Sequence, residues 1–128
     1  MQTLVVEGTH KTPTVNFNPI TGSLEIRGRS IPDNAVEFYE PILSWIGEYA
    51  VSPKPETTLL IELDYFNTSS SKKILDVLKA VELLHLSGKS KAIIKWLYEE
   101  GDDDLKEAAL EFGEIIQVKF ELISVKAD

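Results

Sequence analysis

The sequence lacks cysteine altogether across its 128 residues. Disulfides, thiolate zinc sites and cysteine nucleophiles are therefore excluded. No apolar run approaches the roughly 18 residues that a membrane-spanning helix requires. The N-terminus, MQTLVVEGTHKTP, also lacks the basic region and apolar core of a secretion signal. We therefore expect a cytoplasmic protein.

Positive charge is scarce as well, because 13 Lys and Arg stand against 21 Asp and Glu, for a net charge of −8. Binding to a polyanion requires a basic stripe that neutralises phosphates, and this chain has none. We expect neither nucleic-acid binding nor attraction to an anionic membrane. The charge is compatible with a protein partner that has a basic surface, or simply with a small soluble domain. It leaves the oligomeric state open.

Motifs that carry chemistry are missing too. His10 and His85 stand outside any metal-ligand spacing, and the acidic run 99–104 lacks the alternating Asp residues of a calcium loop. The Gly-Lys-Ser at 88–90 follows a predicted helix instead of preceding one, so it is not a phosphate loop. No nucleophile elbow is present. The sequence therefore predicts no catalytic residue, no metal site and no cofactor.

The sequence does contain two hydrophobic patterns that follow one another regularly: a two-residue alternation typical of strands and a three- to four-residue spacing typical of helices. Period-two alternation predicts strands at 4–6, 14–17, 23–27, 59–66, 92–98 and 116–122. Helical spacing predicts helices at 38–50 and 105–112, and a long one that follows the turn residues 67–71, has its apolar stripe from Ile74 to Leu84 and ends near Leu86. A hairpin followed by alternating helices and strands predicts a single α/β domain over 1–128 with a mixed sheet. We expect the later strands to be parallel and the three helices to lie mostly on one face, leaving the other partly wet.

Two local details limit the helices. A proline in a helix interior costs about 3 kcal/mol, so we expect the first helix to start near Phe38, with Pro41 in its first turn. Gly113 is the predicted stop of the last helix.

The predicted strand 59–66 has one buried and one solvent-exposed side. Its alternation places Tyr65 inward with the Leu and Ile residues at 59, 61 and 63. Glu62 and Asp64 then face outward, and they can serve as an acid–base pair. We favour ordinary ion pairs instead, with Lys95 or Lys119 on neighbouring strands.

The run Asn67-Thr68-Ser69-Ser70-Ser71 joins this strand to the second helix. Such residues favour turns and helix N-caps, since their side chains bond to nearby backbone amides. The first turn of a helix also has free amides and the positive end of the dipole, which suit a phosphate. Plain capping is the simpler interpretation, but one cap needs only one such side chain. A hydroxyl that a kinase modifies is the alternative.

Four segments together resemble the SiaC family of bacterial regulatory phosphoproteins: GTHKTPTVNF, LEIRGRSIPDNAVEFYEPILSWI, LDYFNTSSSKKILDVL and WLYEEGDDDLKEAALEF. The resemblance covers about residues 7–122. It implies a fold similar to the STAS domains of anti-sigma-factor antagonists (SpoIIAA-like). It also implies a non-enzymatic partner switch, in which a dedicated kinase phosphorylates a threonine and a PP2C-type phosphatase removes the phosphate.

The threonine that matches the family's modified residue is Thr68, with Ser69 and Ser70 as less favoured alternatives because Ser71 extends the hydroxyl run. The resemblance implies that the unphosphorylated form binds and activates a diguanylate cyclase, in c-di-GMP signalling and biofilm formation. The expected partner surface comprises Asn67, Thr68, Ser69, Ser70 and Lys72.

Two other functions stay open. An anti-sigma-factor antagonist would use the same switch on an anti-sigma factor or kinase. A small ligand-binding protein or enzyme would instead need a deep pocket with convergent polar groups.

Overall fold

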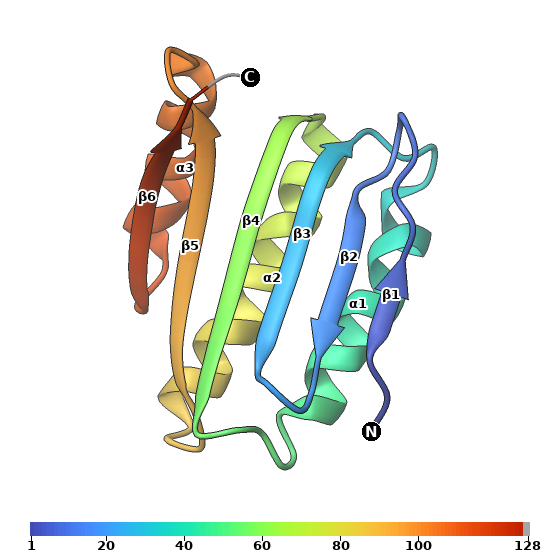
Figure 1. Ribbon diagram of the computed structural model, residues 1–128, viewed down its shortest axis with the longest axis vertical. Helices are drawn as coiled ribbons and strands as arrows, with labels where there is room; N and C mark the ends of the chain where they lie inside the picture. Colours follow the sequence, from blue (N-terminus) through green and yellow to red (C-terminus); the bar gives the residue numbers. More distant parts are fainter. Residues whose placement is uncertain (127–128) are drawn as a thin grey trace.

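The computed structural model describes residues 1–126, so the last two residues of the predicted domain lie outside the described part. Six strands form one sheet in the order of the sequence (Figure 1). The strands are β1 (Leu4–Val6), β2 (Thr14–Asn18), β3 (Ser23–Ser30), β4 (Glu56–Phe66), β5 (Lys91–Glu99) and β6 (Lys119–Val125). The helices are α1 (Ala35–Tyr49), α2 (Thr68–Leu86) and α3 (Asp103–Ile115).

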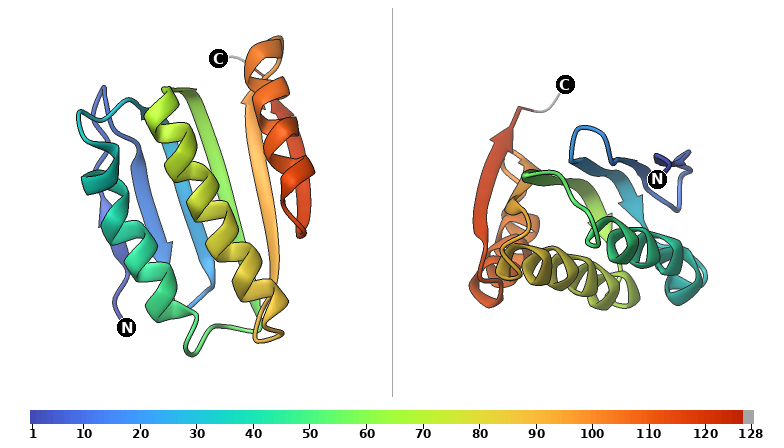
Figure 2. Two further views of the ribbon diagram at one scale, coloured as in Figure 1. Left: turned by 180° about the vertical axis from the view of Figure 1, so that it is seen from behind. Right: turned by 90° about the horizontal axis from the view of Figure 1, so that it is seen from below.

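The sheet is mixed, as the sequence predicts. β1, β2 and β3 are antiparallel, while β3, β4, β5 and β6 are parallel to one another. Each helix connects two adjacent parallel strands, and each crossover advances in the same direction across the sheet. Because such crossovers are right-handed, all three helices lie on the same face (Figure 2). Among the described residues, no helix covers the other face (Figure 2).

The core lies between the sheet and its helices. Alternate strand residues point inward, and the inner stripes of the helices cover them. Fully burying one Leu or Ile contributes about 1.5–3 kcal/mol. The largest buried side chains from the strands and the first two helices include Phe17, Leu24, Ile26, Tyr39, Ile42, Ile46, Tyr49, Leu59, Ile61, Leu63, Ile74 and Trp96.

Both predicted helix limits are wrong. α1 starts at Ala35, where the Asn34 side chain caps it by accepting the Glu37 amide at 3.0 Å, so Pro41 lies inside the helix. The prolyl ring is exposed to solvent, so the break in the helical bonds falls on the wet side. α3 continues through Gly113 to Ile115. A Cβ at position 113 would lie 2.9 Å from Cδ1 of the Phe120 ring. This close contact explains Gly113.

The inward placement of Tyr65 is also wrong. The β3–β4 register jumps from Gly28 opposite Leu63 to Arg29 opposite Tyr65, which leaves Asp64 as an extra residue in β4. Such a bulge reverses the alternation of the residues that follow. Tyr65 is therefore 52% exposed. Phe66 turns inward instead, with ring centroids 6.1 Å from that of Trp96.

The carboxylates of β4 pair with β3, not with the predicted lysines. Arg27 binds both Glu62 and Glu25, the latter at 2.9 Å. Arg29 Nε lies 3.6 Å from an Asp64 carboxylate oxygen. β3 stays beside the whole outer half of β4, whereas the pairing of β4 with β5 ends earlier, at Ile61. The prediction of cross-strand ion pairs is confirmed, but the predicted partners, Lys95 and Lys119, are wrong.

Candidate functional site

The three helix starts share one edge of the sheet. α1, α2 and α3 follow β3, β4 and β5, whose carboxyl ends meet at this edge because the strands are parallel (Figure 1). Free amides and the positive ends of the helix dipoles therefore gather there. Ligand sites of parallel α/β sheets lie outside the carboxyl ends of strands. The hydroxyl run of α2 lies at this edge.

Asn67 is the cap of α2. Its side-chain Oδ1 accepts a hydrogen bond from the Ser70 amide at 2.9 Å, and its carbonyl accepts one from the Ser71 amide at 2.9 Å. Its own amide donates to the carbonyl of Ser30, at the end of β3, at 3.1 Å. These bonds fix the start of α2 to the neighbouring strand.

A buried chain of hydroxyls lies beneath this cap. Ser70 Oγ donates to the Ser30 carbonyl at 2.9 Å, and Ser30 Oγ donates to Ser70 Oγ at 2.9 Å. Each hydroxyl has one proton, so the Tyr39 phenol must donate the remaining bond to Ser30 Oγ, at 2.6 Å. All three side chains are fully buried. The chain ties β3, α1 and α2 together.

The buried tyrosine suits this donor role. Burial raises the pKa of Tyr39 to about 12, although its hydrogen bond with Ser30 acts in the opposite direction. The phenol therefore keeps its proton at any physiological pH and donates throughout.

The hydroxyl run divides into an outer and an inner part. Thr68 and Ser69 are exposed, whereas Ser70 is 0% exposed. Within residues 1–126, the Thr68 hydroxyl makes no hydrogen bond, so nothing holds it away from a modifying enzyme. Ser70 cannot meet an enzyme in the folded state, which removes it as a candidate for phosphorylation and for direct partner contact.

Other predicted surface residues surround Thr68. Lys72 is exposed on the next turn of α2, and Asn67 is half-buried by its capping role. Beside them, a hollow of about 330 Å³ separates the starts of α1 and α2. It is lined by Asp33, Asn34, Ala35, Val36, Ser69, Lys72 and Lys73. Val36 is 59% exposed there and offers an apolar contact.

Reasoning from the sequence missed Ser30, Tyr39 and Val36 as parts of this site. Ser30 lies 40 positions before Ser70, and no local period connects them. Val36 belongs to the helical stripe by spacing alone but points outward. Within residues 1–126, no group of three His, Cys, Asp or Glu is arranged to hold a metal. None of the helices there has the length and apolarity needed to cross a membrane.

These features define a class: a small α/β domain that presents exposed hydroxyls at a helix start tied to the neighbouring strand. The sequence matches the description "SiaC family regulatory phosphoprotein" over residues 6–125, and the chain belongs to that family. It is also 30% identical, over 114 residues, to an uncharacterized protein of Pseudomonas aeruginosa strain UCBPP-PA14. That match covers 89% of this chain and 90% of the relative.

Solved structures agree with the family and the fold. SiaC of Pseudomonas aeruginosa is 28% identical, with a TM-score of 0.89 over 98% of this chain and 100% of that one. Apo-SiaC from the same organism is 27% identical, with a TM-score of 0.84. The match covers 96% of this chain and 99% of the apo-SiaC chain. A third structure holds the diguanylate cyclase SiaD with its activator SiaC from that organism. The matched chain of that structure is 28% identical, with a TM-score of 0.89. The match covers 95% of this chain and 99% of the matched chain.

Proposed function

We propose that this protein is a non-enzymatic partner switch whose binding to a target protein is controlled by reversible phosphorylation of Thr68. The observation that carries the proposal is the division of the hydroxyl run. Thr68 is exposed and makes no hydrogen bond in the described part of the chain, while Ser70, two positions later, is buried and holds the helix start in place. The surface can thus change its charge while the fold beneath it stays the same.

The electrostatics of the helix start favour this arrangement. A phosphate adds about −1.5 to −2 charge and three acceptor oxygens at neutral pH. On Thr68 it would lie at the first turn of α2, where free amides and the helix dipole stabilise negative charge. The exposed Lys72 lies on the next turn. The domain therefore tolerates the modification.

A docked partner does not tolerate it. The partner covers Thr68, Ser69 and Lys72, and a phosphate there introduces a bulky, hydrated dianion into the interface. A loss of about 4 kcal/mol in binding free energy weakens association by about a thousandfold. Binding is therefore switched by local charge without refolding.

The target proposed for this chain is a diguanylate cyclase. SiaC of Pseudomonas aeruginosa is described as the activator of the diguanylate cyclase SiaD, and its structure in that complex has the same fold as this chain. A serine/threonine kinase and a PP2C-type phosphatase complete the switch. A cytoplasmic location belongs to the proposal, because a kinase needs a nucleoside triphosphate.

The test compares binding of a diguanylate cyclase from the same organism to five forms of the protein by calorimetry. Thr68→Ala should bind like the wild type, because it removes only an unbonded hydroxyl. Thr68→Asp should bind at least tenfold more weakly, and protein phosphorylated at Thr68 about a hundredfold or more. Ser44→Asp is the matched control, because Ser44 is exposed on α1 outside the helix starts, and it should bind normally.

Equal affinity of the wild type, Thr68→Asp and the phosphorylated form would refute the switch. Peptide mass analysis of the phosphorylated protein should place the phosphate on Thr68. Its appearance on Ser69 alone would move the switch by one residue.

A further inference from the structure

The sheet is open along one seam, between β4 and β5. Their pairing ends at Ile61 opposite Trp96, although β4 continues to Phe66 and β5 to Glu99. Each strand keeps its outer neighbour to the end: β4 stays paired with β3, and β5 with β6. The separation of the two strands is visible at the top of Figure 1. Residues 62–66 and 97–99 therefore have a strand partner on one side only.

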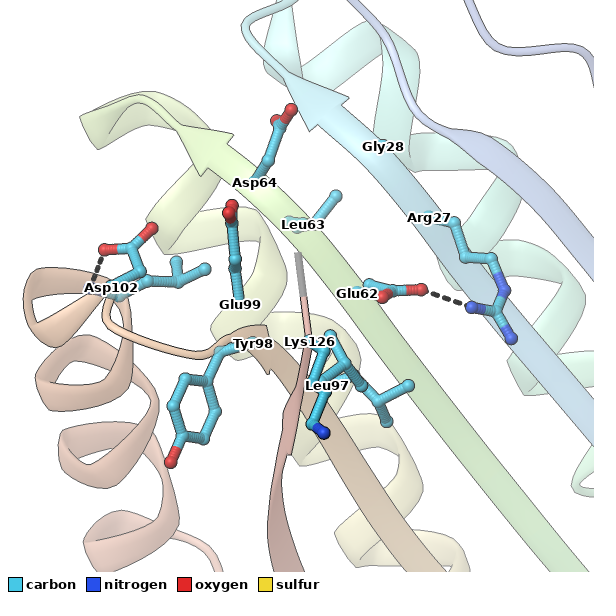
Figure 3. A pocket seen from close by; sticks show the side chains of 12 residues that line it. Arg27, Gly28, Glu62, Leu63, Asp64, Leu97, Tyr98, Glu99, Asp102 and Lys126 are labelled. Atoms are coloured by element: carbon cyan, nitrogen blue, oxygen red, sulfur yellow. Dashed lines mark hydrogen bonds and ion pairs between the residues drawn. The ribbon is translucent and has the colours of Figure 1, made fainter. Parts of the chain in front are cut away.

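A cleft of about 390 Å³ occupies this opening on the helix-free side (Figure 3). Its walls are residues 62–64 of β4 and 97–99 of β5. A second hollow, of about 310 Å³, shares Asp64, Asp102 and Leu105 with it and continues toward α3. The two hollows therefore adjoin, and Leu63, Leu97 and Leu105 are among the apolar residues of the cleft. The open strand edges beside it suit an extended chain.

The charge of the groove indicates the chemistry of its occupant. The cleft is lined by four carboxylates, from Glu62, Asp64, Glu99 and Asp102, but by only two cations, Arg27 and Lys126. Arg27 is already bound by Glu25 and Glu62. Asp64 is paired with Arg29, and Asp102 caps α3 by accepting the Leu105 amide at 3.1 Å. Among residues 1–126, Glu99 and Asp102 have no ion-pair partner, and the second hollow adds Asp104. A segment that carries Lys or Arg is complementary to this surface.

We propose that this cleft binds an extended segment of a partner protein that carries lysine or arginine, by adding a strand between β4 and β5. The unpaired backbone groups of residues 62–66 and 97–99 hydrogen-bond the segment's main chain. Its side chains on the helix-free face contact the half-buried Leu97 and meet the carboxylates at the rim. This mode of recognition takes its affinity from main-chain bonds and its specificity from alternate side-chain sites.

The experiment titrates the protein with the capped peptide Lys-Val-Lys-Val-Lys and follows the backbone amides by NMR. Shifts should concentrate in residues 62–66 and 97–99, and these amides should become protected from hydrogen exchange. The same peptide with N-methylated valines cannot complete the ladder and should bind at least tenfold more weakly. Glu99→Gln should weaken binding about threefold. Glu48→Gln, at an exposed position on α1, should leave it unchanged.

Strand addition is overturned if the peptide does not bind at millimolar concentration, or if its shifts map elsewhere. It is also overturned if free lysine or the N-methylated peptide binds equally well, or if Glu-Val-Glu-Val-Glu replaces the basic peptide without loss. The experiment uses neither a kinase nor a cyclase. Its failure is therefore distinct from failure of the Thr68 switch, and the Thr68→Asp protein should bind the peptide like the wild type.

Discussion

At the scale of single residues, burial gives neighbouring hydroxyls opposite roles. Ser70 contributes its hydroxyl to a closed chain with Ser30 and Tyr39, so its polar atoms are satisfied inside the protein. Thr68 is two positions away and meets solvent. A buried polar group left without its partner costs about 1–3 kcal/mol, whereas an exposed one loses little. Burial thus gives Ser70 a part in stability, while the exposed Thr68 is the residue that we propose for regulation.

Replacing Ser70 tests this division. Ser70→Ala leaves Ser30 Oγ without its acceptor, so the free energy of unfolding should fall by about 1–2 kcal/mol. Ser69→Ala alters an exposed hydroxyl and should stay within about 0.5 kcal/mol of the wild type. Urea denaturation of both variants measures the difference. Equal stability of the two would show that the buried chain contributes nothing.

Tyr39 predicts a loss of stability at high pH. Burial raises its pKa to about 12, while a tyrosine in the unfolded chain titrates near 10. Below pH 10 both states are protonated and the stability is fully present. Between about pH 10 and 12 the unfolded state ionises first, so the folded state should lose about 2–3 kcal/mol.

The comparison that isolates this effect uses two phenylalanine variants. Tyr39→Phe cannot ionise, so its free energy of unfolding should fall less steeply than that of the wild type over this pH range. Tyr65→Phe, at a position that is 52% exposed, should follow the wild-type curve. Denaturation at a series of pH values gives the slopes. Parallel curves for Tyr39→Phe and the wild type would contradict the assignment.

At the scale of elements, packing overrides local preference. Proline lacks the amide that bonds the preceding turn, which disfavours it inside helices. α1 nevertheless runs through Pro41, because the inner side of this helix is buried and the prolyl ring faces solvent. Its buried stripe consists of Ala35, Tyr39, Ile42, Trp45, Ile46 and Tyr49. This stripe, together with the Asn34 cap, decides where α1 begins.

Removing the proline should therefore stabilise the protein. Pro41→Ala restores an amide that can donate to the Glu37 carbonyl. The free energy of unfolding should rise by about 1–2 kcal/mol, which is less than the full proline penalty because alanine loosens the unfolded chain. Ser44→Ala, at an exposed position one turn later, should change stability by no more than about 0.5 kcal/mol. A lower denaturation midpoint for Pro41→Ala would show that the ring's contacts outweigh the missing bond.

At the scale of the whole molecule, a sheet wound in one direction gathers function at one edge. Because every crossover advances the same way, all helix starts lie at the carboxyl ends of the parallel strands. Thr68 follows the end of β4, and the open seam lies between the ends of β4 and β5. Both features therefore lie at the same edge of the sheet.

The open seam predicts an uneven pattern of hydrogen exchange. Amides of residues 62–66 and 97–99 that face the seam should exchange faster than those of residues 57–61 and 92–96, which pair across it. Exchange followed by NMR on the free protein resolves the two groups. Residues 24–27 of β3 pair with β2 on one side and with β4 on the other, so they serve as the protected reference. Uniform protection along β4 and β5 would show that the seam is closed in solution.

The sequence by itself determined the order of helices and strands, the mixed sheet and the position of the hydroxyl run at a strand-to-helix junction. These features follow from periods and caps, which depend on residues close together in the chain. Only the tertiary structure decided that Ser70 faces inward, that Tyr65 faces outward and that β4 and β5 separate. Each of these depends on a neighbour distant in sequence: Ser30 for Ser70, Gly28 and the bulge for Tyr65, and the diverging strand pairs for the seam.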